Sequence, residues 1–205
     1  MSKEKKMGDK VLYSLIPLEE FKMLLGVDDR DDKVSRFCLV TATFSIEQYC
    51  ARRLLRKRHF EYIDFYGDLL IPLKEYPVSN VAAVYSLSAL LPSLFIEPDF
   101  YRVIPDCDCN EDIPFSLSLS PAVKKWRGLI AVKVVYTAGY SSGKIPADLA
   151  SACMELASWN LGRYKGRRIG LTGNVRGSGK NGEHFEMSMP ENVKALLEPY
   201  RRKTI

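Results

Sequence analysis

The spacing of apolar residues changes twice along this 205-residue chain, and no other feature constrains its fold as strongly. From about residue 17 to residue 53, apolar side chains recur every three or four positions, as on one face of a helix. Between residues 59 and 140 they fall in short alternating runs typical of strands, and the helical spacing returns at residue 146. The pattern predicts an α+β fold in which an N-terminal helical hairpin and C-terminal helices pack together, with a central antiparallel β insertion.

Four helices are expected from start and stop signals. The first covers residues 17–25 and is ended by Gly26; the second starts at Asp31 or Asp32 and runs to about Arg53. The third covers residues 146–164, and the last follows a capping-box pattern at residues 188–191. The second helix carries a regular apolar stripe that needs a packing partner, made of Val34, Cys38, Ala42, Ile46 and Tyr49.

Six strands are expected in the middle of the chain. Gly67 and Asp68 separate the first two, which predicts a tight hairpin between them. The expected strands cover residues 60–65, 69–73, 81–87, 100–104, 115–119 and 129–136.

We expect one composite domain, because about 150 residues is typical of a domain and no repeat or long linker divides the chain. Its helical core comprises residues 15–58 and 141–205, and residues 59–140 form a β subdomain. Along the chain, the parts are the N-terminal tail and helices at 1–58, the β-rich middle region at 59–140, and the C-terminal helices with a glycine-rich basic loop (165–187) at 141–205.

The net charge of +5 is unevenly distributed. Residues 52–58 carry five basic groups and no acidic ones, and residues 163–205 carry a net charge of +6, whereas the rest of the chain is acidic. Such blocks attract a phosphate backbone or an acidic protein. Two simpler explanations fit equally well: a charged face exposed to solvent, and basic side chains that offset the negative end of a helix dipole. The candidates for contacts with DNA or an acidic partner are Arg52, Arg53, Arg56, Lys57, Arg58, Arg163, Lys165, Arg167, Arg168, Arg176 and Lys180.

The motifs that usually mark catalysis or cofactor binding are incomplete. Residues 177–182 read GxGxxG, but they follow a helix instead of the strand that a dinucleotide site needs. Cys107 and Cys109 have no second ligand pair with zinc spacing. The two histidines, His59 and His184, belong to no catalytic signature. We therefore expect a protein that is not an enzyme, with no catalytic residue, metal or cofactor.

No membrane segment is expected either. Residues 77–96 carry no charge, but their prolines and polar residues suit strands and turns better than a bilayer span. The N-terminus has no apolar stretch of secretory type, and five cysteines are an odd number, so reduced thiols in the cytoplasm are expected.

Several segments, in this order, resemble the head–tail connector proteins of tailed phages and prophages, also described as adaptor, neck or DNA-packaging proteins. ATFSIEQYCARRLLRKRHFE resembles the long helix of this family, which passes through a basic stretch into a strand. VKVVYTAGYSSGKIPADLASACMELASWNLGRY is similar to its strand, tight turn and following helix, and MPENVKALLEPYRR to its closing helix.

The resemblance implies a structural subunit. The family forms a ring, expected to be dodecameric, between the portal and a tail or head-completion protein, and the genome passes through its channel. It implies a place in the virion neck, and in the host cytoplasm during assembly. The alternatives are a non-specific nucleic-acid-binding module and, less favoured, an unrecognised hydrolase.

Overall fold

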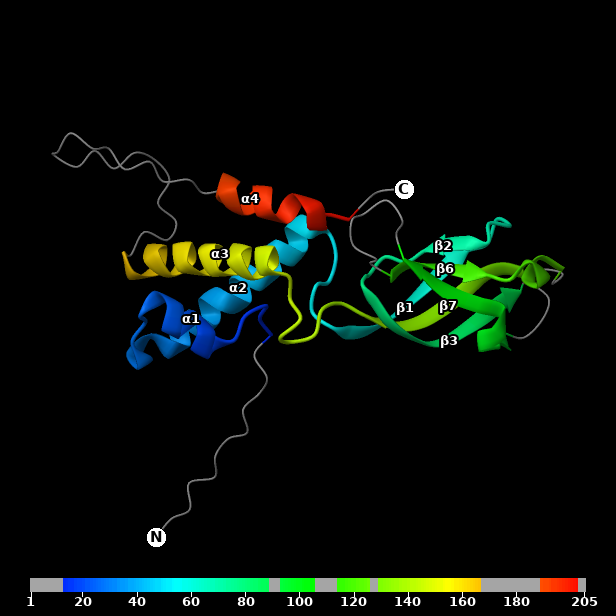
Figure 1. Cartoon of the computed structure of the whole chain (residues 1–205), viewed down its shortest axis with the longest axis horizontal. Coiled ribbons are helices and arrows are strands. Elements are labelled where there is room, and N and C mark those ends of the chain that lie inside the picture. The colour runs from blue at the N-terminus through cyan, green and yellow to red at the C-terminus, as the bar shows by residue number, and fades with distance from the viewer. Residues whose placement is uncertain (1–12, 89–92, 106–113, 126–128, 167–188, 203–205) are drawn as a thin grey trace, which may run out of the picture. The chain divides into compact units, whose positions relative to one another are not determined.

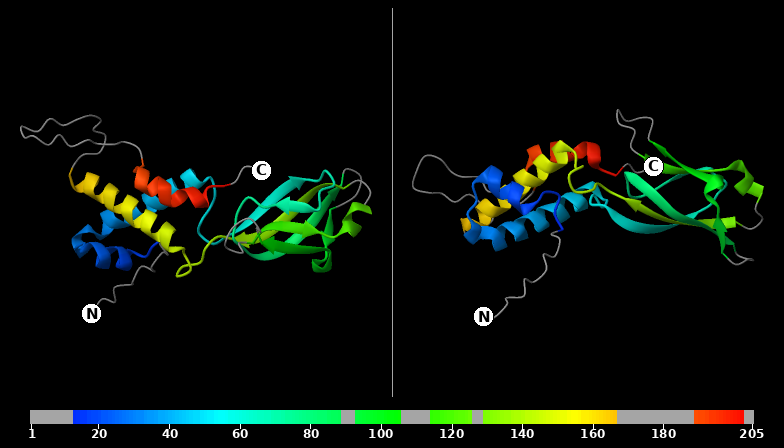
Figure 2. Two further views of the ribbon diagram at one scale, coloured as in Figure 1. Left: turned by 45° about the horizontal axis from the view of Figure 1, so that its top comes forward. Right: turned by 60° about the horizontal axis from the view of Figure 1, so that its bottom comes forward.

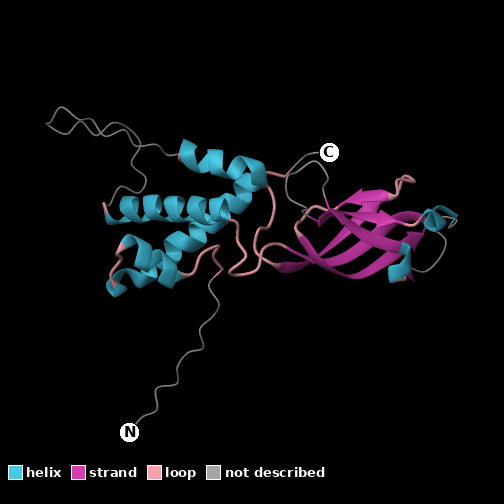
Figure 3. Ribbon diagram, viewed as in Figure 1, coloured by secondary structure: helices cyan, strands magenta, loops and turns pink. Residues whose placement is uncertain are grey.

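The structure is a computed structural model that describes residues 13–88, 93–105, 114–125, 129–166 and 189–202. The chain divides into two compact units, one made of residues 1–50 and 145–201, the other of residues 51–144 and 202–205. The α-helices all belong to the first unit and the β-strands to the second (Figure 3). The predicted α+β class is confirmed, with a central antiparallel region between N-terminal and C-terminal helices.

Among its described residues, the helical unit contains four α-helices: α1 (Leu18–Leu25), α2 (Asp32–Cys50), α3 (Ala147–Lys165) and α4 (Glu191–Leu197). Helix α2 packs against α3, and α4 packs against both (Figures 1 and 2). The stripe predicted on α2 supplies buried Cys38, Ala42 and Ile46, and α3 supplies buried Leu149, Cys153 and Leu156. The N-terminal and C-terminal helices therefore share one core, as predicted.

Backbone conformation sets the ends of the first two helices. Gly26 ends α1 in the left-handed region, at φ 62°, as expected of a glycine stop signal. Helix α2 ends at Cys50, and Ala51 then takes φ 55°. The prediction that this helix continues to Arg53 is wrong, because the left-handed turn at Ala51 ends it before the basic run starts.

Where the structure describes the sheet unit, it contains seven strands in two antiparallel sheets. The larger sheet has the order β1-β7-β3-β4 and the smaller one the order β2-β6-β5. The strands are β1 (Lys57–Asp64), β2 (Leu70–Pro72), β3 (Val78–Ser88), β4 (Leu94–Ile96), β5 (Tyr101–Pro105), β6 (Pro114–Leu119) and β7 (Leu129–Ala138).

Strand pairing differs from the prediction at two places. The hairpin expected around Gly67 and Asp68 is wrong, because β1 pairs with β7 and β2 pairs with β6 in the other sheet. The turn carries the chain from one sheet to the other. Strand β4 was not predicted, since its three residues are all apolar and show no alternation.

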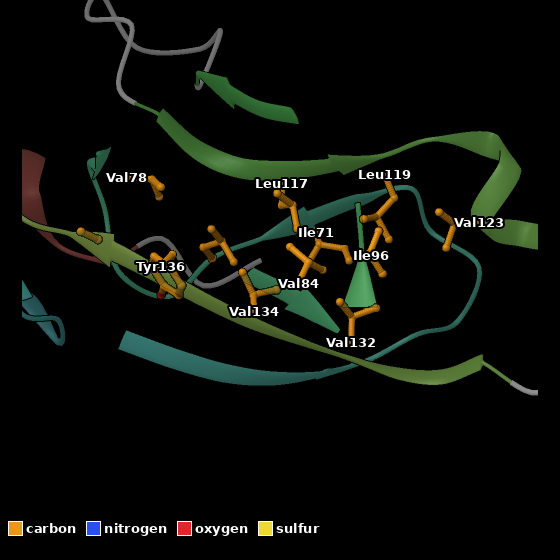
Figure 4. Close-up of a cluster of buried hydrophobic side chains, with 12 residues drawn as sticks. Ile71, Val78, Val84, Ile96, Leu117, Leu119, Val123, Val132, Val134 and Tyr136 are labelled. Atoms are coloured by element: carbon orange, nitrogen blue, oxygen red, sulfur yellow. The ribbon is translucent and has the colours of Figure 1, made fainter. Parts of the chain in front are cut away.

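The core of this unit lies between the two sheets. Val84, Val132 and Val134 from the larger sheet point toward Ile71 and Leu117 from the smaller one (Figure 4). On β7, Val132, Val134, Tyr136 and Ala138 are buried, the alternation that is required when one face of a sheet covers a core. The two sheets thus form a sandwich, and each keeps an outer face.

Candidate interaction surfaces

The basic run at residues 52–58 connects the end of α2 to the start of β1, and its first member is buried. Arg52 is only 4% exposed. Its guanidinium lies 3.7 Å from the ring centroid of Tyr76 and donates a hydrogen bond of 2.6 Å to the Tyr76 carbonyl oxygen. A guanidinium held in this way stabilises the sheet unit and does not face a phosphate backbone, so Arg52 is left out of the surface proposed below.

The other four basic residues of the run, Arg53, Arg56, Lys57 and Arg58, are exposed. Their backbone is fixed: the amide of Arg53 donates to the Glu75 carboxylate at 2.6 Å, and the amide of Arg56 donates to the Tyr140 carbonyl at 2.9 Å. Four cationic side chains are therefore presented at one end of β1.

The second basic block lies on the helical unit where the structure describes it. Arg163 is half-buried, with its guanidinium 4.5 Å from the ring centroid of Trp159. Lys165 forms an ion pair with Asp31. The remaining candidates lie outside the described residues, and they are Arg167, Arg168, Arg176 and Lys180. The structure therefore brings together four cations of the first block. Most candidates of the second block lie outside the described residues.

Strand β1 buries a carboxylate. Glu61 is 8% exposed, and its carboxylate accepts hydrogen bonds from the Tyr136 hydroxyl and, at 3.0 Å, from the Lys74 amide. The Tyr136 hydroxyl in turn accepts a hydrogen bond of 3.1 Å from the Glu75 amide. Burial, with the hydrogen bond to the Glu61 carboxylate, raises the pKa of Tyr136 well above its usual range. This network belongs to the interior of the sandwich.

Because residues alternate between the faces of a strand, burying Glu61 places its two aromatic neighbours on the outer face. Phe60 is 68% exposed and Tyr62 is 58% exposed, and their rings meet edge to face with centroids 6.3 Å apart. Strand β1 therefore has a polar residue inside and large apolar residues outside.

The aromatic residues continue across the larger sheet as one row. The register pairs Tyr62 on β1 with Lys133 on β7, Lys133 with Tyr85 on β3, and Tyr85 with Phe95 on β4. The Lys133 ammonium lies 5.4 Å from the ring centroid of Tyr62 and 5.9 Å from that of Tyr85. Tyr85 and Phe95 meet edge to face at 5.8 Å. We call these four residues, together with Phe60, the aromatic row.

The helical unit also exposes apolar side chains. On α1, Met23 and Leu24 are 76% and 60% exposed, each four residues after an exposed glutamate, Glu19 or Glu20. We call these four residues the α1 face. On α2, Phe37 and Phe44 are exposed on the same side of the helix, about two turns apart.

The described residues do not form a catalytic constellation. An open cleft of about 700 Å³ lies beside β1, lined by Glu61, Asp64, Lys74 and Arg202 among others, and its lining contains no serine, cysteine or histidine. No group of three or more metal-ligating side chains occurs in the described part of the chain.

The thiols in the described residues are buried. Cys38, Cys50 and Cys153 are free cysteines in the helical unit. Burial raises the pKa of the Cys153 thiol to about 11, although a contact with the Thr43 hydroxyl opposes this. Cys107 and Cys109 lie outside the described residues.

Sequence reasoning missed the aromatic row. Alternation in β1 is ambiguous, since apolar residues occupy both faces, and the usual rule would place Phe60 and Tyr62 in the core. The one local indication of an unusual strand was a glutamate, Glu61, flanked by two aromatic residues. Glu61 can be buried because the Tyr136 hydroxyl, 75 residues away in the chain, donates a hydrogen bond to its carboxylate.

Comparisons with solved structures place the fold among proteins of phage-like particles. The chain matches a protein in the neck of an empty gene transfer agent (GTA) particle at a TM-score of 0.60 and 21% identity, and one in the neck of a native GTA particle at 0.56 and 23%. It also matches a chain of the native GTA virion at 0.54 and 23%. Each match covers 93% of this chain and 91% of the other.

The two neck structures were computed with sixfold and twelvefold symmetry, and all three matches are to parts of phage-like particles, which are structural assemblies. Neither protein-family models nor curated proteins give a match. No described helix combines the length and apolar character needed to cross a membrane.

Proposed function

We propose that this chain is a structural subunit of the neck of a tailed phage, prophage or phage-like particle, and that it forms a ring between portal and tail through which DNA passes. One observation carries the proposal: both units of the fold are matched, over 93% of the chain, by proteins of symmetric particle necks. A match that spans a helical unit and a β-sandwich together is more specific than a match to either alone.

The partners follow from the position in the particle. In a ring, each subunit contacts two neighbouring copies, and we propose that a dodecamer assembles on the portal and contacts a tail or head-completion protein on its other side. The virion neck, reached from the host cytoplasm during assembly, is the proposed location.

We propose that the basic residues face DNA in the channel or an acidic surface of the portal. The described candidates are Arg53, Arg56, Lys57 and Arg58 at the start of β1 and Arg163 and Lys165 at the end of α3. The candidates outside the described residues are Arg167, Arg168, Arg176 and Lys180. Their side chains would act through charge alone, because phosphate contacts give affinity without sequence preference.

The proposal is tested by electron microscopy of the protein alone and mixed with the portal of the same particle. We expect rings, or a collar of density on one end of the portal. Monomers that leave the portal bare at micromolar concentration would contradict the neck function.

The basic residues are tested separately by their salt dependence. If they face DNA, the wild-type protein binds duplex DNA at low salt, and the triple variant Arg53→Ser, Arg56→Ser, Lys57→Ser shows a shallower slope of log affinity against log salt. The slope should change by up to about 0.9 for each phosphate that the variant no longer neutralises. The matched control is Arg102→Ser, an exposed arginine on β5. Steep DNA binding without any portal collar would favour the alternative, a non-specific nucleic-acid-binding module.

A further inference from the structure

We infer that the aromatic row on the outer face of the larger sheet binds the α1 face of a second copy of this chain. This inference deepens the proposed ring and rests on it: it assigns the two different surfaces through which neighbouring subunits join.

In a lone subunit, the arrangement of β1 carries an energetic cost. Strand β1 buries the Glu61 carboxylate, which costs free energy because the charge loses its hydration. It also exposes the rings of Phe60 and Tyr62 to water, so the free energy that burying these apolar surfaces would provide is lost. The second oxygen of the Glu61 carboxylate has no hydrogen-bond partner among the described residues. A strand that turns its aromatic side outward in this way is suited to an interface that covers those rings.

The aromatic row is held on a rigid part of the sheet. Tyr62, Lys133, Tyr85 and Phe95 occupy directly paired positions on four adjacent strands, so their side chains lie on a rigid surface instead of a loop. Phe95 is 50% exposed at the far strand, and Phe60 extends the row along β1. Aromatic residues are enriched at the centres of protein interfaces, where preorganised rings lose little entropy on binding.

The charges around the row and around the α1 face are opposite in sign. The row carries Lys133 in its centre, and the same face of β1 adds exposed Arg58, two positions before Phe60, and exposed Asp64, two positions after Tyr62. Two basic groups against one acidic group leave this face with a net positive charge. On the helical unit, the α1 face combines Met23 and Leu24 with two glutamates, so it offers both apolar cover and opposite charge.

The other exposed apolar stripe of the helical unit fits less well. Phe37 on α2 follows exposed Lys33 by one turn and adjoins exposed Arg36, so its surroundings carry the same sign of charge as the aromatic row. The ring of Phe44 already stacks on Tyr13, with centroids 5.2 Å apart. Like charges brought together at an interface cost affinity. Of the two apolar surfaces, only the α1 face is electrostatically complementary to the row.

The inferred contact joins two different surfaces. A contact of this heterologous kind repeats from subunit to subunit and closes into a ring when the rotation between neighbours divides a full turn. Each subunit then offers its aromatic row to one neighbour and its α1 face to the other.

The test measures assembly of full-length variants, by electron microscopy with portal and by sedimentation without it. We expect Tyr62→Ser and Phe95→Ser to raise the concentration needed for assembly about tenfold or more, as central aromatic residues do. The matched control is Tyr66→Ser, which removes a tyrosine that is 86% exposed but lies outside the row. Circular dichroism melting confirms that each variant is folded.

Charge exchange identifies the occupant. We expect Arg58→Glu and Glu20→Lys each to weaken assembly several-fold at low salt, and the variant with both changes to recover most of the loss, because the opposite charges are then restored across the interface. Arg102→Glu combined with Glu20→Lys is the control pair and restores nothing.

The outcomes separate this inference from the proposed function. If wild-type protein forms neither ring nor collar, the neck function fails. If wild-type protein assembles and Tyr62→Ser assembles equally well, the surface assignment fails and the neck function stands. If Tyr62→Ser abolishes assembly but the double charge exchange restores nothing, the row binds something other than the α1 face, such as the portal or the tail protein, and the inference is overturned.

Discussion

Gly139 lies so close to Leu55 that a Cβ atom at residue 139 would come within 2.7 Å of both the carbonyl carbon and the carbonyl oxygen of Leu55. The contact holds the exit of β7 against the segment that enters β1. Two hydrogen bonds continue it, from the Tyr140 amide to the Leu54 carbonyl at 2.7 Å and from the Arg56 amide to the Tyr140 carbonyl at 2.9 Å. The start of the exposed basic run is therefore positioned by backbone packing.

Replacing Gly139 by alanine should destabilise the sheet unit strongly. The residue has φ 99°, which disfavours any side chain, and the added methyl group would strike backbone that cannot rotate away. We expect a loss of about 3 kcal/mol or more in urea unfolding. Gly143→Ala is the control: Gly143 has φ 81° but open space around it, so it should lose only about 1 kcal/mol. Equal losses in the two variants would contradict a steric role for Leu55.

Arg52 and Arg53 are adjacent, yet their replacement should have very different effects. Arg52→Ala removes a buried guanidinium stacked on Tyr76 and should cost about 2–3 kcal/mol of unfolding free energy. Arg53→Ala should change the free energy of unfolding by about 0.5 kcal/mol or less, because the side chain is exposed and the backbone amide that donates to the Glu75 carboxylate is retained. Urea titration of both variants checks this, and a mild Arg52→Ala variant would show that the stacked contact contributes little.

Tyr136→Phe should destabilise the sandwich without altering its packing. The substitution removes the hydroxyl that donates to Glu61 and accepts from the Glu75 amide, so a buried carboxylate and an amide each lose a partner. We expect a loss of about 1–3 kcal/mol. In the double variant Tyr136→Phe, Glu61→Gln the loss should be smaller than the sum of the two single losses, because both changes disrupt the same network. Additive losses would indicate that the two groups act independently.

Glu75 should make the stability of the protein depend on pH. Burial raises the pKa of its carboxyl group above the ordinary value of 4.5, so the native state holds this proton more tightly than the unfolded state. The contribution of the group to stability is therefore greatest below pH 4.5 and falls as the pH rises through its native pKa. The unfolding free energy of wild-type protein minus that of Glu75→Gln should decline over this range.

Asp29 gives the opposite sign and serves as the control. Its hydrogen bond and ion pair with Lys22 hold the pKa of the carboxyl below its ordinary value. The difference between wild-type protein and Asp29→Asn should therefore increase as the pH rises through the range in which the carboxyl ionises. Parallel curves for the Glu75 and Asp29 variants would contradict the assigned causes.

The described thiols should be unreactive in the native protein. Burial raises the pKa of Cys153 to about 11 and also raises that of Cys38, so few thiolates exist at pH 8 and reagents have no access to them. In a Cys107→Ser, Cys109→Ser variant, Ellman's reagent at pH 8 should detect thiols only on the timescale of unfolding, and three per chain in denaturant. Rapid native reaction would show that the helical core opens readily.

The helical part of the fold could be predicted largely from local sequence. Repeats of three and four residues place Cys38, Ala42 and Ile46 on one face, and Gly26 can take the left-handed turn that ends a helix. The stop after α2 was missed because alanine has no such preference, yet Ala51 takes φ 55°. The strands were located by alternation, apart from the short β4.

Strand pairing depended on residues that lie far apart in the chain. Local sequence indicates that residues 57–64 and 70–72 are extended, but Gly67 permits either a hairpin or a crossing between sheets, and the partners of these strands are distant. In the same way, the charge of the basic run is a property of composition, whereas the burial of Arg52 depends on Tyr76.

Near neighbours along the chain were thus sufficient for the α+β class, the helix faces and the two concentrations of positive charge, because each of these is a local property. The inward position of Glu61 and the outward positions of Phe60 and Tyr62 required the folded sandwich. A strand has two faces, and residues distant in sequence select the one that is buried.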